Sequence, residues 1–138
     1  MAKIRNQRKT RVLIVDDSAM LRQGLTSLCE LQSELEVVGT AGDGVEALEA
    51  IRNLKPDVVS LDIRMPRMSG IDVLRAIKRD RLTCTPIILS GMADEFFRRK
   101  CVALGAKYVF DKGAELEKYL RALGRPHKTK RKYPGARI

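Results

Sequence analysis

Five polar side chains each follow a short apolar segment and could act together on one ligand. They are the carboxylates of Asp16, Asp17 and Asp62, the hydroxyl of Ser90 and the amine of Lys112. Three carboxylates held at one place repel one another, so such a cluster favours a bound cation. Because the cluster holds oxygen donors and no histidine or cysteine, we expect a hard cation, with Mg²⁺ preferred. The amine and the hydroxyl suit an anion with several oxygens, such as a phosphoryl group.

Phosphoryl transfer is the chemistry that this combination of groups favours. A carboxylate can itself be the nucleophile and form an aspartyl phosphate. The metal and Lys112 would then neutralise charge on the transferred group, which is most of what such catalysis requires. Taken singly, each residue has an ordinary interpretation, since an acid pair after a strand is often a charge pair at a helix N-terminus. A shared site therefore requires a fold that brings all five residues together.

The apolar segments alternate with helical patterns along the chain. Short runs rich in β-branched residues predict five strands, over residues 11–15, 36–40, 57–62, 86–90 and 107–110. Apolar residues at helical spacing predict a helix after each strand: one capped by Ser18, one ending before Pro56, then 71–79, 93–104 and a last one ending at Gly124. The inward faces of the first and last helices are predicted to be Leu21, Leu25 and Leu28, and Leu116, Leu120 and Leu123. We therefore expect an α/β fold, a three-layer, doubly wound (βα)₅ protein whose five-stranded parallel sheet is covered on both faces.

Such a sheet would place the polar residues at one edge. In open parallel sheets, ligands bind in the crevice at the carboxyl ends of the strands. The predicted strands end at Asp16–Asp17, Asp62 and Ser90, and Lys112 comes just after the fifth. Two other phosphate-binding motifs are missing. The turn after the first strand lacks Gly-x-Gly-x-x-Gly and carries acids that would repel a pyrophosphate, and the sequence has no Gly-Lys-Ser/Thr loop.

The composition is that of one globular domain with two basic ends. The chain has 138 residues, 44% of them hydrophobic, and a formal charge of +10. Five basic residues lie in residues 1–11 and six in 125–138, so residues 12–124 hold 16 bases against all 17 acids. We expect a basic N-terminal arm over residues 1–10, a folded domain over 11–124 and a disordered basic tail over 125–138.

Several function classes are disfavoured by the sequence. The three cysteines are widely spaced, which predicts small buried hydrophobes rather than disulfides or a zinc site. No apolar run reaches the roughly 18 residues of a membrane span, and no apolar stretch follows the basic N-terminus as in a signal peptide, so we expect a cytoplasmic protein without membrane contact. Nucleic-acid binding through the tail is an alternative, disfavoured because no aromatic platform and no recognition helix accompany it.

Four segments of the sequence together resemble the receiver domain of two-component response regulators. They are Val12–Ser18, Asp62–Gly70, Ile88–Gly91, and Gly105–Ala106 with Lys112. The resemblance covers about residues 11–124 and implies a flavodoxin-like (βα)₅ sandwich, in agreement with the predicted elements. Fourteen residues beyond Gly124 are too few for an output domain, so the protein is either a stand-alone single-domain receiver or part of a longer protein.

The resemblance also implies a role for each candidate residue. Asp62 would accept the phosphoryl group, and Asp16 and Asp17 would hold Mg²⁺ together with Asp62 and the backbone carbonyl of Arg64. Ser90 and Lys112 would contact the phosphoryl oxygens. The phosphoryl donor would be a histidine kinase or a His-phosphotransfer protein. A downstream protein partner would bind at the face formed by the fourth helix, fifth strand and fifth helix, where residues 98–100 add a basic patch.

The sequence departs from the family pattern near the lysine. The position three residues before Lys112, where the family has its switch aromatic, is Val109, and alternation predicts Tyr108 and Phe110 on the opposite face of the sheet. Gly113 follows the lysine, where the family often has proline. We therefore expect phosphorylation to act on residues 91–105 rather than on the fifth strand. Arg64, two residues after the acceptor, is predicted to face the mouth of the site and to influence the lifetime of the phosphoryl group.

The resulting hypothesis is a signalling switch, not an enzyme acting on other molecules. One alternative is a small Mg²⁺-dependent phosphatase of doubly wound fold, disfavoured because such enzymes usually need Asp-x-Asp, whereas this chain has the adjacent pair Asp16-Asp17. The other is a receiver-like interaction module that does not use phosphate, disfavoured because all five polar residues are present.

Overall fold

All five strands are parallel and form one sheet in the order β2-β1-β3-β4-β5. The computed structural model describes residues 8–125, so most of the predicted basic arm and nearly all of the predicted tail lie outside the described residues. The strands are β1 (Thr10–Val15), β2 (Leu35–Ala41), β3 (Val58–Leu61), β4 (Thr85–Ser90) and β5 (Tyr108–Asp111). The central strands β3 and β4 are buried along their whole length, as expected for apolar runs covered on both faces.

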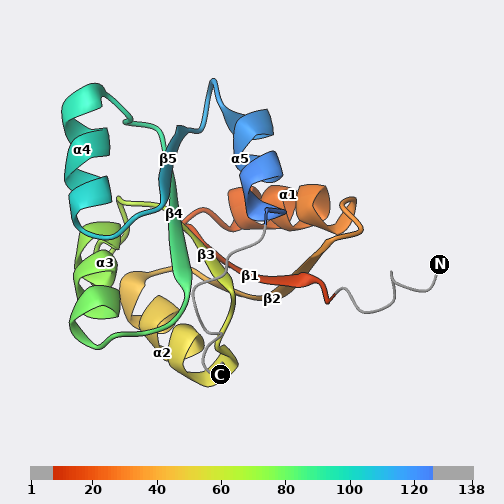
Figure 1. Ribbon diagram of the computed structural model, residues 1–138, viewed down its shortest axis with the longest axis horizontal. Coiled ribbons are helices and arrows are strands. Elements are labelled where there is room, and N and C mark those ends of the chain that lie inside the picture. Colours follow the sequence, from red (N-terminus) through yellow and green to blue (C-terminus); the bar gives the residue numbers. More distant parts are fainter. Residues whose placement is uncertain (1–7, 126–138) are drawn as a thin grey trace, which may run out of the picture.

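Five helices cover the two faces of the sheet. They are α1 (Ala19–Glu30), α2 (Gly44–Leu54), α3 (Gly70–Arg79), α4 (Glu95–Ala103) and α5 (Leu116–Leu123). Figure 1 shows α1 and α5 on one side of the sheet and α2, α3 and α4 on the other. Each begins and ends within a few residues of its predicted bounds, and Ser18 caps α1 by accepting a hydrogen bond from the backbone N–H of Leu21 at 3.1 Å. The predicted three-layer doubly wound fold is confirmed.

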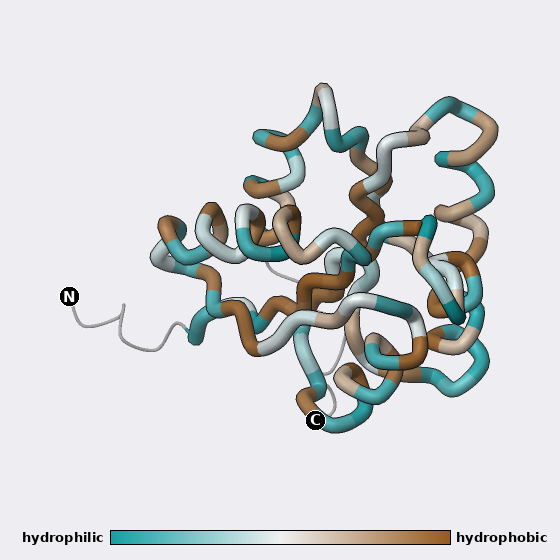
Figure 2. Tube along the Cα trace, turned by 180° about the vertical axis from the view of Figure 1, so that it is seen from behind, coloured by the Kyte–Doolittle hydropathy of each residue, from teal (hydrophilic) through white to brown (hydrophobic). Residues whose placement is uncertain are grey.

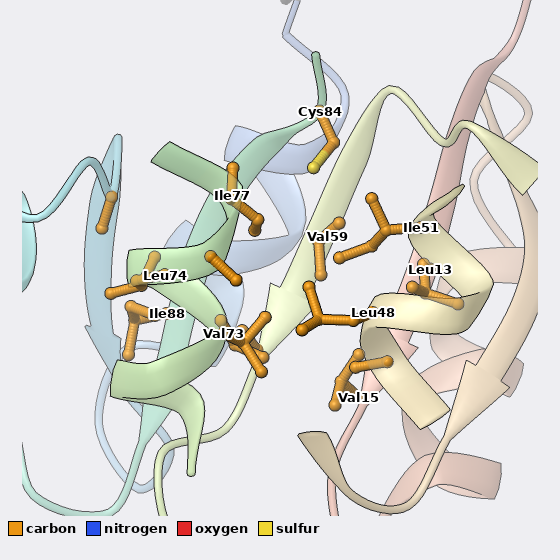
Figure 3. Packing of buried hydrophobic residues seen from close by; sticks show 14 of the residues in the cluster. Leu13, Val15, Leu48, Ile51, Val59, Val73, Leu74, Ile77, Cys84 and Ile88 are labelled. Carbon is orange, nitrogen blue, oxygen red and sulfur yellow. The ribbon is translucent and has the colours of Figure 1, made fainter. Parts of the chain in front are cut away.

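The larger hydrophobic cluster lies between the sheet and helices α2, α3 and α4. Figure 3 shows Leu48 and Ile51 of α2 and Val73 of α3 packed near Leu13 and Val59 of the strands. Seen from behind, hydrophobic residues gather along the strands in the middle of the molecule, while the surrounding helices alternate hydrophobic and hydrophilic residues (Figure 2). This segregation is what removes apolar surface from water and holds the strand ends in fixed positions.

The cysteines behave as small hydrophobes, as the sequence predicts. Cys29, Cys84 and Cys101 are free and buried. Burial raises the pKa of the Cys84 thiol to about 12 and that of Cys29 to about 11. Both thiols are therefore protonated at neutral pH and unsuited to metal binding.

The second cluster, under α1 and α5, differs from the predicted inward faces. In α1 the buried side chains are Leu25 and Cys29, and in α5 they are Tyr119, Ala122 and Leu123. The other predicted leucines of the two helices are only half-buried. A tyrosine was not expected inside, but Tyr119 is completely buried because its hydroxyl donates a hydrogen bond to Ser60 Oγ at 2.6 Å.

Replacing Tyr119 by phenylalanine should destabilise the fold by about 1–2 kcal/mol, because the buried Ser60 hydroxyl would lose its partner. Urea unfolding of Tyr119→Phe against wild type measures this free energy. Tyr108→Phe is the matched control, since the Tyr108 hydroxyl accepts its hydrogen bond from Arg125 at the surface and its loss should have little effect. Equal stability of Tyr119→Phe and wild type would contradict a structural role for this hydrogen bond.

Candidate functional site

The three predicted acids meet at the carboxyl ends of two neighbouring strands. Asp16 and Asp17 follow β1, and Asp62 follows β3, which pairs with β1. The backbone N–H of Asp62 donates to the carbonyl of Val15 at 3.0 Å, so the ladder continues to the site. One carboxylate oxygen from each acid lies within 4.8 Å of the others. The predicted convergence is present, and its all-oxygen donor set fits a hard divalent cation.

Lys112 lies directly beside two of these acids. Its Nζ is 2.9 Å from Asp16 Oδ2 and 3.4 Å from Asp62 Oδ1. Burial lowers the pKa of Lys112, but its hydrogen bond to Asp16 and the charges of Asp62 and Asp16 raise it more, so the pKa is raised overall. Lys112 therefore carries its positive charge at neutral pH and partly offsets the repulsion between the carboxylates.

Ser90 is joined to Lys112 through the backbone. The N–H of Lys112 donates to the carbonyl of Ser90 at 2.9 Å, which extends the pairing of β4 and β5. The side chain of Ser90 is buried, and its Oγ accepts a hydrogen bond from the N–H of Met92 at 3.0 Å. The hydroxyl proton is thereby left for donation to a ligand.

A cavity of about 510 Å³ lies where these residues meet. Its lining comprises Asp17, Asp62, Arg64, Ser90, Gly91, Met92 and Lys112. Asp16 is buried and contacts Lys112 beside the cavity, whereas Arg64 is exposed and Met92 is 39% exposed. The structure thus brings together all the predicted site residues, including the segment that carries the Arg64 carbonyl.

The acceptor candidate Asp62 has an unfavourable electrostatic position. Burial raises its pKa, and the nearby charge of Asp16 raises it further, while Lys112 acts in the opposite direction. The net direction is upward, so the ionised carboxylate is disfavoured relative to an exposed one. A cation bound among the three acids would relieve this repulsion and favour the ionised, nucleophilic form.

Two arginine side chains outside the predicted site hold the loops that carry Asp16 and Asp62. Arg67, in the segment after Asp62, donates from Nε and Nη2 to Asp43 Oδ2 at 3.0 and 2.8 Å, which ties this segment to the start of α2. Arg22 of α1 donates to the carbonyl of Asp16 at 2.7 Å. The Arg67–Asp43 contact joins residues 24 positions apart, so no local pattern could have shown it, whereas Arg22 and Asp16 are only six positions apart.

Gly70, at the start of α3, packs directly against the backbone of Asp62. A Cβ at this position would lie 2.2 Å from the carbonyl oxygen of Asp62 and 2.9 Å from the Cα of Ile63. Only a residue without a side chain lets α3 begin this close to the backbone of Asp62. Gly70 ends the Asp62–Gly70 motif, but the motif by itself does not indicate this positioning role.

Gly70→Ala should destabilise the protein by about 2–3 kcal/mol, because either α3 or the backbone of Asp62 must move. Gly24→Ala is the control, since Gly24 lies inside α1 with nothing within 4 Å of an added Cβ, and this change should stabilise by about 0.5–1 kcal/mol. Urea unfolding of both variants gives the two free energies. A Gly70→Ala protein as stable as wild type would show that the contact with Asp62 is not restrictive.

The side chains of β5 point to the two faces of the sheet as predicted. Val109 packs in the cluster under α2, α3 and α4, whereas Tyr108 and Phe110 pack on the opposite face, as alternation predicts.

The predicted basic patch on α4 must exclude Arg98, because its guanidinium bonds to groups of the same chain and its side chain is only 32% exposed. Arg99 remains exposed, in an ion pair with Glu95 one turn earlier.

The sheet order and the position of the acids define a class of protein. A parallel sheet in the order 2-1-3-4-5, with helices on both faces and polar residues at its carboxyl edge, is a flavodoxin-like doubly wound α/β fold. Within this class, the chain matches the response regulator receiver domain over residues 12–123 and belongs to that family. The resemblance seen in the sequence is thereby confirmed.

Individual relatives agree with this membership. The chain is 48% identical over 86 residues to a protein-glutamate methylesterase/protein-glutamine glutaminase of Lawsonia intracellularis, a match that covers 62% of this chain and 24% of that protein. The response regulator domain of Thermotoga maritima CheB has a TM-score of 0.77 at 32% identity, covering 86% of this chain and all of that one. A chain of the CheX–CheY–BeF₃–Mg²⁺ complex of Borrelia burgdorferi has a TM-score of 0.74 at 28% identity, covering 89% of this chain and 96% of that one.

The matched segment spans about a quarter of the methylesterase from Lawsonia intracellularis, so the similarity concerns the receiver part of that larger enzyme. None of the helices within residues 8–125 is long and apolar enough to cross a membrane.

Proposed function

We propose that this protein is a phosphorylation-dependent signalling switch in which Asp62 accepts a phosphoryl group. The donor would be a phosphohistidine on a histidine kinase or on a His-phosphotransfer protein. The observation that carries this proposal is the convergence of Asp16, Asp17 and Asp62 within 4.8 Å, with Lys112 Nζ 3.4 Å from Asp62. Membership of the receiver family supports the same assignment.

The residues of the site suit an in-line displacement. A carboxylate oxygen of Asp62 attacks the phosphorus, the bond from phosphorus to the donor nitrogen breaks, and its electron pair stays on that nitrogen. The Lys112 ammonium and the Ser90 hydroxyl would then donate to the phosphoryl oxygens, since both line the same cavity as Asp62. The reaction at Asp62 would thus be the phosphorylation of the receiver domain itself.

Mg²⁺ is the cofactor that this donor set favours. Asp16, Asp17, Asp62 and the Arg64 carbonyl would hold it, and when bound it would supply charge neutralisation for the phosphoryl group. The structure of the related Borrelia burgdorferi complex contains BeF₃ and Mg²⁺, which supports the same choice here.

The phosphorylated state would be transmitted to a protein partner at the α4–β5–α5 face. On α4, Phe96 is 80% exposed and Val102 is 53% exposed, so this helix presents apolar surface beside the charged Arg99. Exposed apolar side chains rimmed by polar ones are typical of contact surfaces. The effect of Arg64 on phosphoryl lifetime and a cytoplasmic location stay predictions.

Incubation with acetyl phosphate and Mg²⁺, followed by intact mass measurement, tests the proposal directly. A phosphorylation switch would retain one phosphoryl group long enough for its mass to be measured. A phosphatase would hydrolyse acetyl phosphate without keeping the group, and a phosphate-independent module would neither bind nor hydrolyse it. Retention of a single phosphoryl group is the expected result.

A further inference from the structure

Arg98 of α4 joins three segments of the chain through one guanidinium group. Its Nε donates to the carbonyl of Ala93 at 2.7 Å, its Nη1 to the carbonyl of Val109 at 2.5 Å, and its Nη2 to Glu115 Oε1 at 2.8 Å. Ala93 belongs to the loop between β4 and α4, Val109 to β5, and Glu115 to the start of α5. Figure 1 shows α4 and α5 on either side of β5, the strand between them.

The contacts of Glu115 continue to the loop that carries Lys112. Glu115 Oε1 also accepts a hydrogen bond from the N–H of Asp111 at 2.9 Å, and Asp111 Oδ2 accepts from the N–H groups of Gly113 and Ala114 at 3.0 and 2.8 Å. The backbone on both sides of Lys112 is therefore held by groups that lead to Arg98. Together with the bond from the Lys112 N–H to the Ser90 carbonyl, this forms a continuous polar path from the candidate site to α4.

We propose that Arg98 is a positioning residue that couples the Lys112 loop to helix α4. The coupling rests on the proposed function, because contacts of Lys112 and Ser90 with a phosphoryl group are what would move the two loops. Arg98 touches none of the reacting groups and acts through Glu115 and through the Val109 carbonyl.

The physical character of this link suits it to transmit a small movement. A guanidinium has a planar set of donors, so its three acceptors cannot shift independently without breaking a hydrogen bond. The bonds are charge-assisted, and the side chains of Arg98 and Glu115 are only 32% and 20% exposed, which distinguishes the pair from the exposed surface pairs of α4. The Arg98 hydrogen bond and the Asp111 N–H lower the pKa of Glu115, so its carboxylate stays ionised near neutral pH.

The side chains of β5 do not place an aromatic ring between the candidate site and α4. Val109 is small and buried on the α4 side of the sheet, and the rings of Tyr108 and Phe110 stack on the other side with their centroids 5.6 Å apart. No ring of β5 therefore lies between the candidate site and α4. Within residues 8–125, β5 and α4 share apolar packing around Val109 and Cys101, and the hydrogen bond from Arg98 to the Val109 carbonyl links them through polar groups.

Hydrogen exchange of residues 91–105, with and without beryllofluoride and Mg²⁺, tests the coupling in the full chain. Arg98→Gln should lose at least about half of the change in protection seen in wild type, since the ion pair and the planar donor set are both removed. Arg99→Gln is the matched control on the same helix, because it removes only an exposed ion pair with Glu95, and it should respond as wild type does. Arg98→Lys keeps the charge without the three-way geometry and should give an intermediate response.

Parallel measurements separate this proposal from the phosphorylation proposal. Phosphoryl uptake by wild type from acetyl phosphate reports on the function of Asp62, and its absence would overturn that function and the coupling together. Uptake by wild type with a full exchange response in Arg98→Gln would overturn the coupling alone. A lower melting temperature with an undiminished response would assign Arg98 a structural role only. If Arg98→Gln does not fold, Glu115→Gln removes the same ion pair with little change in shape but keeps the Arg98 bonds to the Ala93 and Val109 carbonyls, so it should show a smaller but still reduced response, and a full response would overturn the coupling.

Discussion

Wild-type protein incubated with acetyl phosphate and Mg²⁺ should gain the mass of one phosphoryl group, and Asp62→Asn should gain none. The reason is that an amide oxygen is a far weaker nucleophile than a carboxylate and cannot form an acyl phosphate. Asp62 also stands nearest to Lys112 among the acids that line the cavity. Intact mass spectrometry of the two proteins, treated side by side, measures the effect.

Two controls restrict the interpretation of that experiment. Asp72→Asn makes the same chemical change at an exposed position of α3, where Asp72 pairs with Arg75 at the surface, and it should be labelled as wild type is. Mild alkali should remove the label, because acyl phosphates are labile to base whereas serine phosphate is more stable. An alkali-stable adduct, or full labelling of Asp62→Asn, would move the acceptor to another residue.

Mg²⁺ should raise the melting temperature of wild type, and Asp17→Asn should lose most of that response. A ligand that binds only the folded state stabilises it by about 2.7 kcal/mol at a hundredfold excess over its Kd, which for a domain of this size is on the order of 10 °C. Asp17 is the exposed member of the three acids, so its substitution should remove a metal ligand with little effect on folding. Thermal unfolding over a Mg²⁺ titration provides the measurement.

The metal-free proteins supply the reference for this comparison. Asp17→Asn without Mg²⁺ should melt at or somewhat above wild type, because the exposed carboxylate is removed from a cluster of three acids that repel one another. Asp72→Asn should keep the full Mg²⁺ response. If Asp17→Asn responds to Mg²⁺ as wild type does, the three acids are not the binding site.

The order of elements and the identity of the site residues could be predicted from the sequence because both depend on local patterns. The run Val12–Val15 is too short and too rich in β-branched residues for a helix, and the acids that follow it mark the strand end. Once strands and helices alternate, the handedness of the crossovers leaves few topologies, and all strand ends fall at one edge of the sheet. The positions of Asp16, Asp62 and Lys112 at this edge therefore follow from local patterns in the sequence.

Interior faces of helices were predicted less well, because burial depends on which element covers which. Tyr119 has a polar group that usually keeps a residue near the surface, and only its pairing with Ser60, 59 positions away, makes complete burial favourable. Leu116 and Leu120 have the right spacing, yet α5 turns Tyr119 and Ala122 toward the sheet. Spacing identifies a helix face, but packing selects which part of that face is inside.

The sequence by itself determined the strand–helix order, the carboxylate cluster with its serine and lysine, and the family, since each is encoded in short segments in register. The tertiary structure alone decided which charged residues are free to meet a partner. Arg98 and Arg99 are neighbours of the same type, and nothing local distinguishes them. Arg99 stays exposed beside Glu95, whereas Arg98 meets Val109 and Glu115, which only the packing of α4 against β5 and the start of α5 brings within reach. Long-range proximity, rather than residue type, separates a surface charge from a positioning residue.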